Sequence, residues 1–548
     1  MAKRKRTGGV SLRVRATVCA VALLCAGIAG VGALNAGVQP QDLAASDNPA
    51  QQQTADEGQA AEPLPESRVS AGMPLSDGQL DEQEASRDAA AADEAAQAAD
   101  GNASVSAFAS VGEARPQQEQ SDFEALPTDE ELPAHEDASV LAQVAEGISL
   151  AQLQQMLQDV EGVDTSGVSE GDLNLGLAPL TITDGTSIAQ MAEKLETIPG
   201  IDGAQPNYRY TIAAEGSAES KPADLADSAG IAATADAAAL ADLSAQMSLN
   251  DPDAGQQWGL ESVNAPAAWD TLDSLGKLDA DVSVAVIDTG VQVDHEDLKG
   301  TIKATHYISN SDTSKVDSSV TSVEDVVGHG THVAGIVSAE ANNGVGVAGV
   351  SYNAGLVAVK ASLSDTDASH LDSFDTASLY AAYKWLLGKD PEDETQTVAE
   401  KYNVKVINMS IGAFDDNGSA NTRTPNKHRD EILVEEIDSA AEAGILTVCA
   451  AGNNSKTHAV PFAVYPGDCS TALSVINLTT NDDSQNKNAD GGAFNAVNGV
   501  YLSNTSNYNV EGTTADSEAT KDISAPGTAI YSTVCSGLYG KKYGNKFI

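Results

Sequence analysis

Two short, well-separated runs of residues have the side chains needed to activate a nucleophile. The run Val284–Gly290 places Asp288 after an apolar stretch, and the run Gly328–Gly335 places His329 between two glycines. A carboxylate that accepts a hydrogen bond from one imidazole nitrogen fixes the tautomer, so the other nitrogen can act as a general base. A third run, Ala450–Asn453, ends in a side-chain amide that can donate to an oxyanion. These residues predict nucleophilic acyl-transfer chemistry.

The three runs, in this order, resemble the subtilisin-like serine proteases (subtilases, peptidase S8 family), whose triad is read Asp, His, Ser along the chain. The resemblance covers roughly Asn250 to Ile548. It implies that Asp288 orients His329, that His329 is the general base, and that Asn453 donates to the oxyanion. The alternatives are an Asp288 turn that caps its own backbone and an Asn453 that only ends a strand.

The second histidine of the run, His332, is a rival candidate for the base. The resemblance assigns the base to the first histidine, His329. We therefore predict that His332 is a packed structural residue.

The serine is where the sequence departs from the family. In relatives it lies in a run similar to Gly-Thr-Ser-Met-Ala at the start of a helix. Here Ser524–Gly527 and Ile530–Thr533 match the segment just upstream, and the sequence then ends at Ile548. Neither Ser532 nor Ser536 lies in the right context to substitute. Either the sequence stops short of the serine, which we favour because every upstream site is intact, or the protein is natively short and inactive.

The resemblance also implies a substrate-binding edge and a calcium site. Ser410, Ile411 and Gly412 follow a strand-like run and correspond to the edge that pairs with a substrate backbone. Ala413 stands where many relatives carry a second glycine. The implied calcium ligands all offer oxygen, as calcium prefers: Asp251, Asp297, Ala341, Asn343, Val345 and Val347. The alternative is a glycine-rich turn from Ala341 to Val347 that binds no metal.

Composition narrows the class of protein further. The 548 residues carry a formal net charge of −50, with 80 acidic and 30 basic residues, which argues against nucleic acid as a partner. Cys449, Cys469 and Cys535 lie outside the N-terminal apolar segment and allow either one disulfide and one thiol or three thiols. None lies at metal-ligand spacing from a histidine, so we predict no zinc site.

The chain divides into five parts. Residues 1–36 are typical of a signal peptide, because basic residues precede an apolar stretch that ends in small residues; an uncleaved anchor is the alternative. Residues 37–139 are acidic and poor in apolar side chains, which predicts a disordered leader. Residues 140–212 predict a small domain, 213–249 a linker with a maturation site, and 250–548 the subtilisin-like domain without its C-terminal part.

The small domain is predicted to be an α+β, ferredoxin-like unit. Helices are expected after Ser149 and Ser187, a strand is expected from the alternation of Leu173, Leu175 and Leu177, and Pro206–Tyr210 is expected to be extended. This pattern resembles the subtilase propeptide, a folding aid and inhibitor whose C-terminal tail lies in the active-site cleft. An unrelated small α+β domain is the alternative.

The subtilisin-like domain is predicted to be α/β, with a doubly wound, mostly parallel sheet. Four short apolar runs are typical of buried parallel strands: Val282–Ile287, Leu356–Val359, Val404–Met409 and Ile445–Ala450. Helices are expected over Ser373–Leu387 and Glu431–Ala443, the second ended by Gly444. Asp288 then lies at the carboxyl end of a strand, where such sheets bind ligands.

The sequence therefore predicts a secreted or cell-surface serine endopeptidase made as a zymogen. Its expected partners are protein or peptide substrates and its own propeptide, its expected cofactor is structural calcium, and it is expected to be a monomer. The alternative is a catalytically inactive secreted scaffold that binds peptides or partners through the same cleft.

Overall fold

The computed structural model describes part of the chain: residues 132, 135–212, 248–278, 281–367, 369–413, 429–452, 465–479, 501–502, 506–507, 521–528, 530–535, 538–543 and 546–547. The predicted signal peptide, nearly all of the predicted leader and residues 213–247 of the predicted linker lie outside these residues. Strand β1 begins at His135, so the last residues of the predicted leader belong to a strand. Within the part of the chain that is described, no helix has both the length and the apolar character to span a bilayer.

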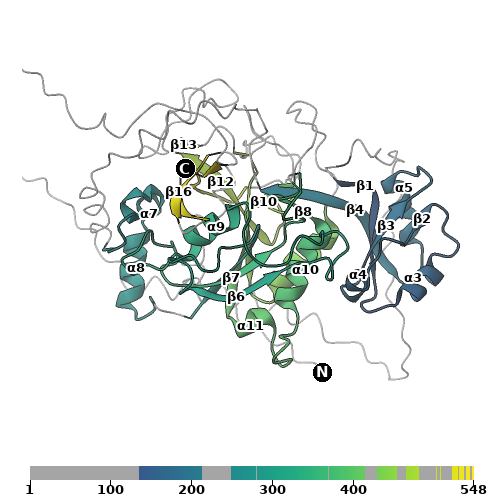
Figure 1. Ribbon diagram of the computed structural model, residues 1–548, viewed down its shortest axis with the longest axis horizontal. Coiled ribbons are helices and arrows are strands. Elements are labelled where there is room, and N and C mark those ends of the chain that lie inside the picture. The colour runs from purple at the N-terminus through teal and green to yellow at the C-terminus, as the bar shows by residue number, and fades with distance from the viewer. Residues whose placement is uncertain are drawn as a thin grey trace, which may run out of the picture. The chain divides into compact units, whose positions relative to one another are not determined.

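A small antiparallel sheet with helices is formed by the first described segment (Figure 1). Its elements follow one another as β1 (His135–Val144), α3 (Leu150–Met156), β2 (Val163–Asp164), α4 (Glu170–Asn174), β3 (Leu177–Ile182), α5 (Ile188–Glu196) and β4 (Ile201–Ile212). The strand order is β4-β1-β3-β2. The helices pack on this sheet through an apolar core of their own, which includes Leu153, Leu173, Met191 and Leu195.

The two helices predicted from their caps are confirmed. The Ser149 side chain accepts from the backbone N–H of Gln152, and Ser187 does the same for Gln190, so each serine caps the first turn. The strand predicted from Leu173 to Leu177 is wrong. Ser169 forms a capping box with Asp172 that starts α4, and β3 begins only at Leu177.

The larger sheet is mostly parallel, as predicted. Its order is β13-β12-β11-β9-β5-β7-β6, with β14 beside β12, and among these described strands only β13 runs antiparallel to its neighbour. The strands are β5 (Ser283–Asp288), β6 (Ile302–Tyr307), β7 (Gly355–Lys360), β9 (Val404–Met409), β11 (Leu446–Ala450), β12 (Ala472–Thr479), β13 (Tyr501–Leu502) and β14 (Ile523–Pro526). A three-stranded sheet follows, β15 (Tyr531–Val534), β16 (Leu538–Tyr543) and β17 (Lys546–Phe547).

Helices cover both faces of this sheet, which is the doubly wound arrangement. Along β5, Val284 and Val286 join one buried cluster, whereas Ala285 and Ile287 join the other. The first cluster includes residues of α8 (Ala265–Ser274) and α9 (His329–Ser338), and the second includes residues of α10 (Thr376–Leu387) and α12 (Glu431–Glu442). The short helices η5 (Ala254–Gln256), α7 (Trp258–Ser262) and α11 (Val398–Lys401) complete the described domain.

Two helix boundaries are set by buried aspartates. Ser373–Asp375 form a short strand, β8, and α10 begins at Thr376, because the Asp375 carboxylate accepts from the backbone N–H of Ser378. The prediction of a helix from Ser373 was therefore early by three residues. Helix α12 is capped in the same way by Asp430 and ends at Glu442, and Gly444, with a positive φ of 79°, follows its C-cap as predicted.

Candidate active site

Asp288 and His329 meet at the carboxyl end of β5. Asp288 is the last residue of that strand and His329 the first of α9. Asp288 Oδ1 lies 2.6 Å from His329 Nδ1, and both side chains are only 1% exposed. The same oxygen accepts from the backbone N–H of Thr289 at 2.7 Å. The carboxylate can therefore hold the proton of the imidazole on Nδ1 and leave Nε2 as a base.

A close backbone approach brings the helix to the strand. A Cβ at Gly330 would lie 2.1 Å from the carbonyl oxygen of Gly290, so any larger residue would push α9 away from β5. The backbone N–H of Gly330 donates to Thr289 Oγ1 at 3.0 Å. The glycine after His329 is thus needed to bring the imidazole within reach of Asp288.

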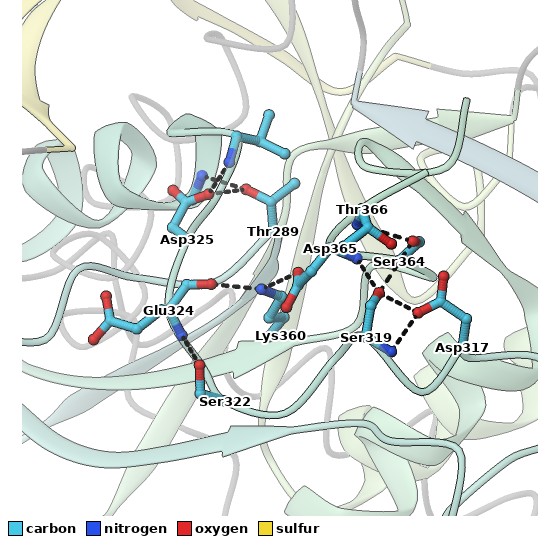
Figure 2. A network of polar contacts seen from close by, with 12 residues as sticks. Thr289, Asp317, Ser319, Ser322, Glu324, Asp325, Lys360, Ser364, Asp365 and Thr366 are labelled. Carbon is cyan, nitrogen blue, oxygen red and sulfur yellow. Dashed lines mark hydrogen bonds and ion pairs between the residues drawn. The ribbon is translucent and has the colours of Figure 1, made fainter. Parts of the chain in front are cut away.

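Asp325 holds the turn that leads into His329, a role that the sequence analysis missed. One carboxylate oxygen accepts from Thr289 Oγ1 at 2.9 Å and from the backbone N–H groups of Val327 and Gly328. The other accepts from the backbone N–H and the hydroxyl of Thr331, each at 2.8 Å. Figure 2 shows Asp325 and Thr289 pointing toward each other. An aspartate just before a helix start is the sequence signal that was available.

The buried lysine Lys360 also supports the turn that leads into His329. Lys360 is fully buried, stands opposite Asp288 in the register of β5 and β7, and lies 2.6 Å from Asp365 Oδ1. Its ammonium also donates to the carbonyl oxygen of Glu324, the residue before Asp325 (Figure 2). The buried charge is therefore paired, and it ties the turn to the loop that follows β7.

We expect Asp325→Ala to destabilise the chain by about 3 kcal/mol, because it leaves several buried donors at the start of α9 without an acceptor. Thermal and urea unfolding of the full chain measure the change. Asp317→Ala is the matched control, since Asp317 is exposed and accepts only from its near neighbour Ser319 among the contacts drawn in Figure 2. Equal losses in the two variants would contradict the role given to Asp325.

The edge predicted from Ser410, Ile411 and Gly412 is paired with the small domain. Ile411–Ala413 form β10, and Ser410 lies buried just before it, with its hydroxyl accepting from Asn408 at 3.0 Å. Strand β10 pairs antiparallel with the end of β4, and β8 pairs with β4 on its other side. Figure 1 shows the long β4 arrow running from the small sheet to these two strands. The end of β4 is thus the middle strand of three.

Other predicted residues have different outcomes. His332 is buried, with Nε2 3.1 Å from the carbonyl oxygen of Ile530, as expected of a packed histidine.

Asn453 lies outside the described residues. The preceding turn is described: Gly452 has a φ of 88°, and the buried Asn507 donates from its side chain to Ala451 and from its backbone to Gly452. Asn507 was missed because no local pattern links it to this turn.

The predicted calcium residues converge from three segments. Asp251 and Asp297 are fully buried. Asp251 accepts from the backbone N–H groups of Asn342 and Asn343, and Asp297 accepts from the side chain of Asn343 at 2.8 Å and from the backbone N–H of Val347 at 2.9 Å. Burial raises the pKa of Asp251, despite these hydrogen bonds. The structure thus places two buried carboxylates at the predicted loop, and carboxylate oxygens are among the ligands that calcium prefers.

The described cysteines are thiols that stay protonated. Cys449 and Cys469 are buried, and burial raises the pKa of both. Cys535 lies beside α9, with its sulfur donating to the carbonyl oxygen of Asp325, and burial raises its pKa to about 12. None of the three therefore has the thiolate character of a catalytic nucleophile.

The segment that carries Asp288 and His329 is similar in sequence to known proteins. Residues 279–546 match the subtilase family, Peptidase S8. Thermitase of Thermoactinomyces vulgaris is 27% identical over 296 residues, which cover 54% of this chain and 79% of thermitase. Subtilisin E of Bacillus subtilis (strain 168) is 30% identical over 283 residues, which cover 52% of this chain and 55% of subtilisin E. The chain thus spans about half the length of that subtilisin. The part of the chain that carries Asp288 and His329 belongs to the subtilase family of subtilisin-like serine proteases.

Proposed function

We propose that this chain is the zymogen form of a secreted, monomeric serine endopeptidase that hydrolyses protein or peptide backbones. The Asp288–His329 contact carries the proposal, because a buried carboxylate 2.6 Å from an imidazole at the carboxyl end of a parallel strand is the base half of a triad. Substrate binding is assigned to Ser410, Ile411 and Gly412, and residues 1–36 are assigned to export.

The proposed reaction is a two-step acyl transfer. His329 Nε2 takes the proton of a serine hydroxyl as its oxygen attacks the scissile carbonyl, while Asp288 stabilises the imidazolium. The Asn453 amide donates to the oxyanion. His329 then gives the proton to the leaving amine, and water attacks the acyl-enzyme by the same route to release the carboxylic acid. The nucleophile is assigned to the serine of a Gly-Thr-Ser run such as the family carries.

Residues 140–212 are proposed to be the propeptide of this enzyme, a ferredoxin-like inhibitory domain. The strand order β4-β1-β3-β2 with helices between the strands supports the ferredoxin-like assignment. The pairing of β4 with both β8 and β10 supports inhibition, because the end of β4 occupies the edge assigned to the substrate. Maturation is assigned to a cut between residues 213 and 250.

Sequencing of the gene past the codon for Ile548 tests the proposal. An in-frame Gly-Thr-Ser run is expected, and its product is expected to hydrolyse casein in a reaction blocked by a fluorophosphonate. A verified stop codon directly after Ile548 would refute the enzyme and favour the catalytically inactive, peptide-binding scaffold. Casein hydrolysis that a fluorophosphonate does not block would refute the serine mechanism.

Calcium is proposed to be held by Asp251, Asp297, Asn343 and the carbonyl groups of Ala341, Val345 and Val347, where it would offset the buried negative charge. Binding to the folded state alone stabilises it by about 2.7 kcal/mol at a hundredfold excess of ligand over Kd. We expect the full chain to melt at a higher temperature in calcium than in chelator, and Asp297→Ala to erase most of that difference.

Asp294→Ala is the control for this melting experiment, because Asp294 is exposed and lies outside the loop. It should keep the calcium-dependent shift of the wild type. Equal midpoints for the wild type in the two buffers would refute the site. A shift that survives Asp297→Ala would place the cation elsewhere.

A further inference from the structure

The end of β4 is held in the groove by backbone pairing that any sequence could make. We call residues 205–212 the tail. We call the two strands that pair with its end on either side, β8 and β10, the groove. Tyr210 lies opposite Phe374 of β8 and Ala413 of β10, and Thr211 lies opposite Ser373 and Gly412. The backbone hydrogen bonds of an antiparallel ladder contribute affinity but do not depend on which side chains the bound strand carries. Selectivity for particular side chains must therefore come from the pockets that receive alternate side chains.

The pocket that receives Tyr210 is apolar on its walls and polar at one point. Tyr210 is 2% exposed and belongs to a buried cluster with Phe374, Leu379, Ile411 and Leu433, contributed by β8, α10, β10 and α12. The Tyr210 hydroxyl donates to Asp430 Oδ2. Burial raises the pKa of Tyr210 well above its ordinary value, so the phenol keeps the proton that it donates.

Asp430 has two functions that use different oxygens. Oδ1 accepts from the backbone N–H of Leu433 at 3.0 Å, which caps α12, and from the side chain of Gln205 at 2.7 Å. Oδ2 accepts from Thr376 Oγ1 at 2.7 Å and from Tyr210. Helix capping therefore accounts for one oxygen, whereas the other faces the aromatic ring held in the groove.

We infer that Asp430 is a specificity-determining residue that selects tyrosine at the substrate position opposite Ala413. This inference rests on the proposed function, because it treats the tail as occupying the place of a substrate. Tyrosine alone combines an aromatic ring for the apolar walls with a hydroxyl donor for Oδ2. Phenylalanine leaves a buried carboxylate short of a donor, and acidic residues are repelled. A site built to bond a hydroxyl rejects the analogue that lacks it far more strongly than an apolar pocket rejects a size change.

The experiment uses the full chain, with its own tail as the peptide ligand. Hydrogen exchange of the amides of residues 209–212, measured by mass spectrometry, reports how often the tail leaves the groove. Tyr210→Phe should lower this protection by about tenfold or more, the cost of losing a hydrogen bond to a buried charge. Tyr208→Phe is the matched control, because Tyr208 is a buried tyrosine on the same strand whose hydroxyl makes no hydrogen bond to the described residues. Its backbone N–H, which the substitution keeps, donates to Thr376 Oγ1.

Asp430→Ser separates selection from helix capping. Serine caps helices about as well as aspartate, so α12 should persist, but its short side chain cannot also reach the tyrosine hydroxyl. In the Asp430→Ser background, Tyr210→Phe should change protection of the tail by less than about threefold, because the partner of the hydroxyl is already absent. Unchanged exchange of the β5 and β9 amides verifies that each variant folds.

Each outcome decides the inference. Equal protection in the Tyr210→Phe and Tyr208→Phe chains overturns selection of the hydroxyl, as does a Tyr210→Lys tail that docks as tightly as the wild type. If Tyr210→Phe still lowers the protection of the tail tenfold in the Asp430→Ser background, another group binds the tyrosine hydroxyl, and the role of Asp430 is overturned. Wild-type tail amides that exchange as fast as those of an unstructured peptide would refute the groove itself, and with it the substrate edge of the proposed function.

Discussion

A polypeptide of residues 1–548 is expected to leave casein uncut. It contains the proposed base, His329, and the proposed orienting carboxylate, Asp288, but no hydroxyl or thiol of the described residues is hydrogen-bonded to the imidazole of His329. Ser532 donates to the carbonyl oxygen of His332, and Cys535 donates to that of Asp325 with its pKa raised to about 12. Loss of the nucleophile of a triad lowers turnover on the order of 10⁶-fold, about as much as loss of all three members.

The measurement is casein hydrolysis by the purified polypeptide, with and without a fluorophosphonate, beside subtilisin E as the positive control. Cleavage that the fluorophosphonate blocks and that co-purifies with the polypeptide would contradict this expectation. Binding of a casein peptide without cleavage would agree with it.

His329→Ala is expected to stop maturation in a chain that continues in frame through a Gly-Thr-Ser run. Self-cleavage between residues 213 and 250 is the first turnover of such a zymogen and needs the general base. Substitution of the base costs on the order of 10⁶-fold in turnover. Intact mass and gel mobility after expression without other proteases report the result.

His370→Ala is the control for maturation. His370 is also bonded through Nδ1 to an aspartate, Asp367, at 3.0 Å, but this pair is partly exposed. This variant should mature like the wild type. Normal maturation of His329→Ala would show that another protease processes the chain and would refute self-cleavage.

The elements that were predicted well are those whose boundaries depend on neighbours in sequence. Ser149 and Ser187 start their helices by bonding to residues three positions later, and Gly444 ends α12 through its own backbone conformation. The buried strands were predicted for a similar reason. A parallel strand covered on both faces is apolar at nearly every position, so a short apolar run identifies it.

The two errors in these elements come from short segments with competing signals. Leu173 and Leu177 sit on opposite sides of the turn at Gly176, so their alternation belongs to the end of a helix and the start of a strand. Ser373–Asp375 precede α10 but are drawn into a strand by pairing with β4, which is more than 150 residues away in the sequence. Tertiary pairing overrides local preference in such short segments.

The family, the parallel sheet and the pairing of Asp288 with His329 could be predicted from the sequence, because each depends on a local motif or an apolar run. Only the tertiary structure shows which residues support that pair and which residue contacts the tyrosine of the tail. Asp325 accepts hydrogen bonds from Thr289, just after β5, and from Thr331 of α9, and Asp430 contacts Tyr210, which is 220 residues away in the sequence. Hydrogen bonds between distant segments leave no periodic or local trace in a sequence. They exist only once apolar burial has brought those segments together and removed competing water.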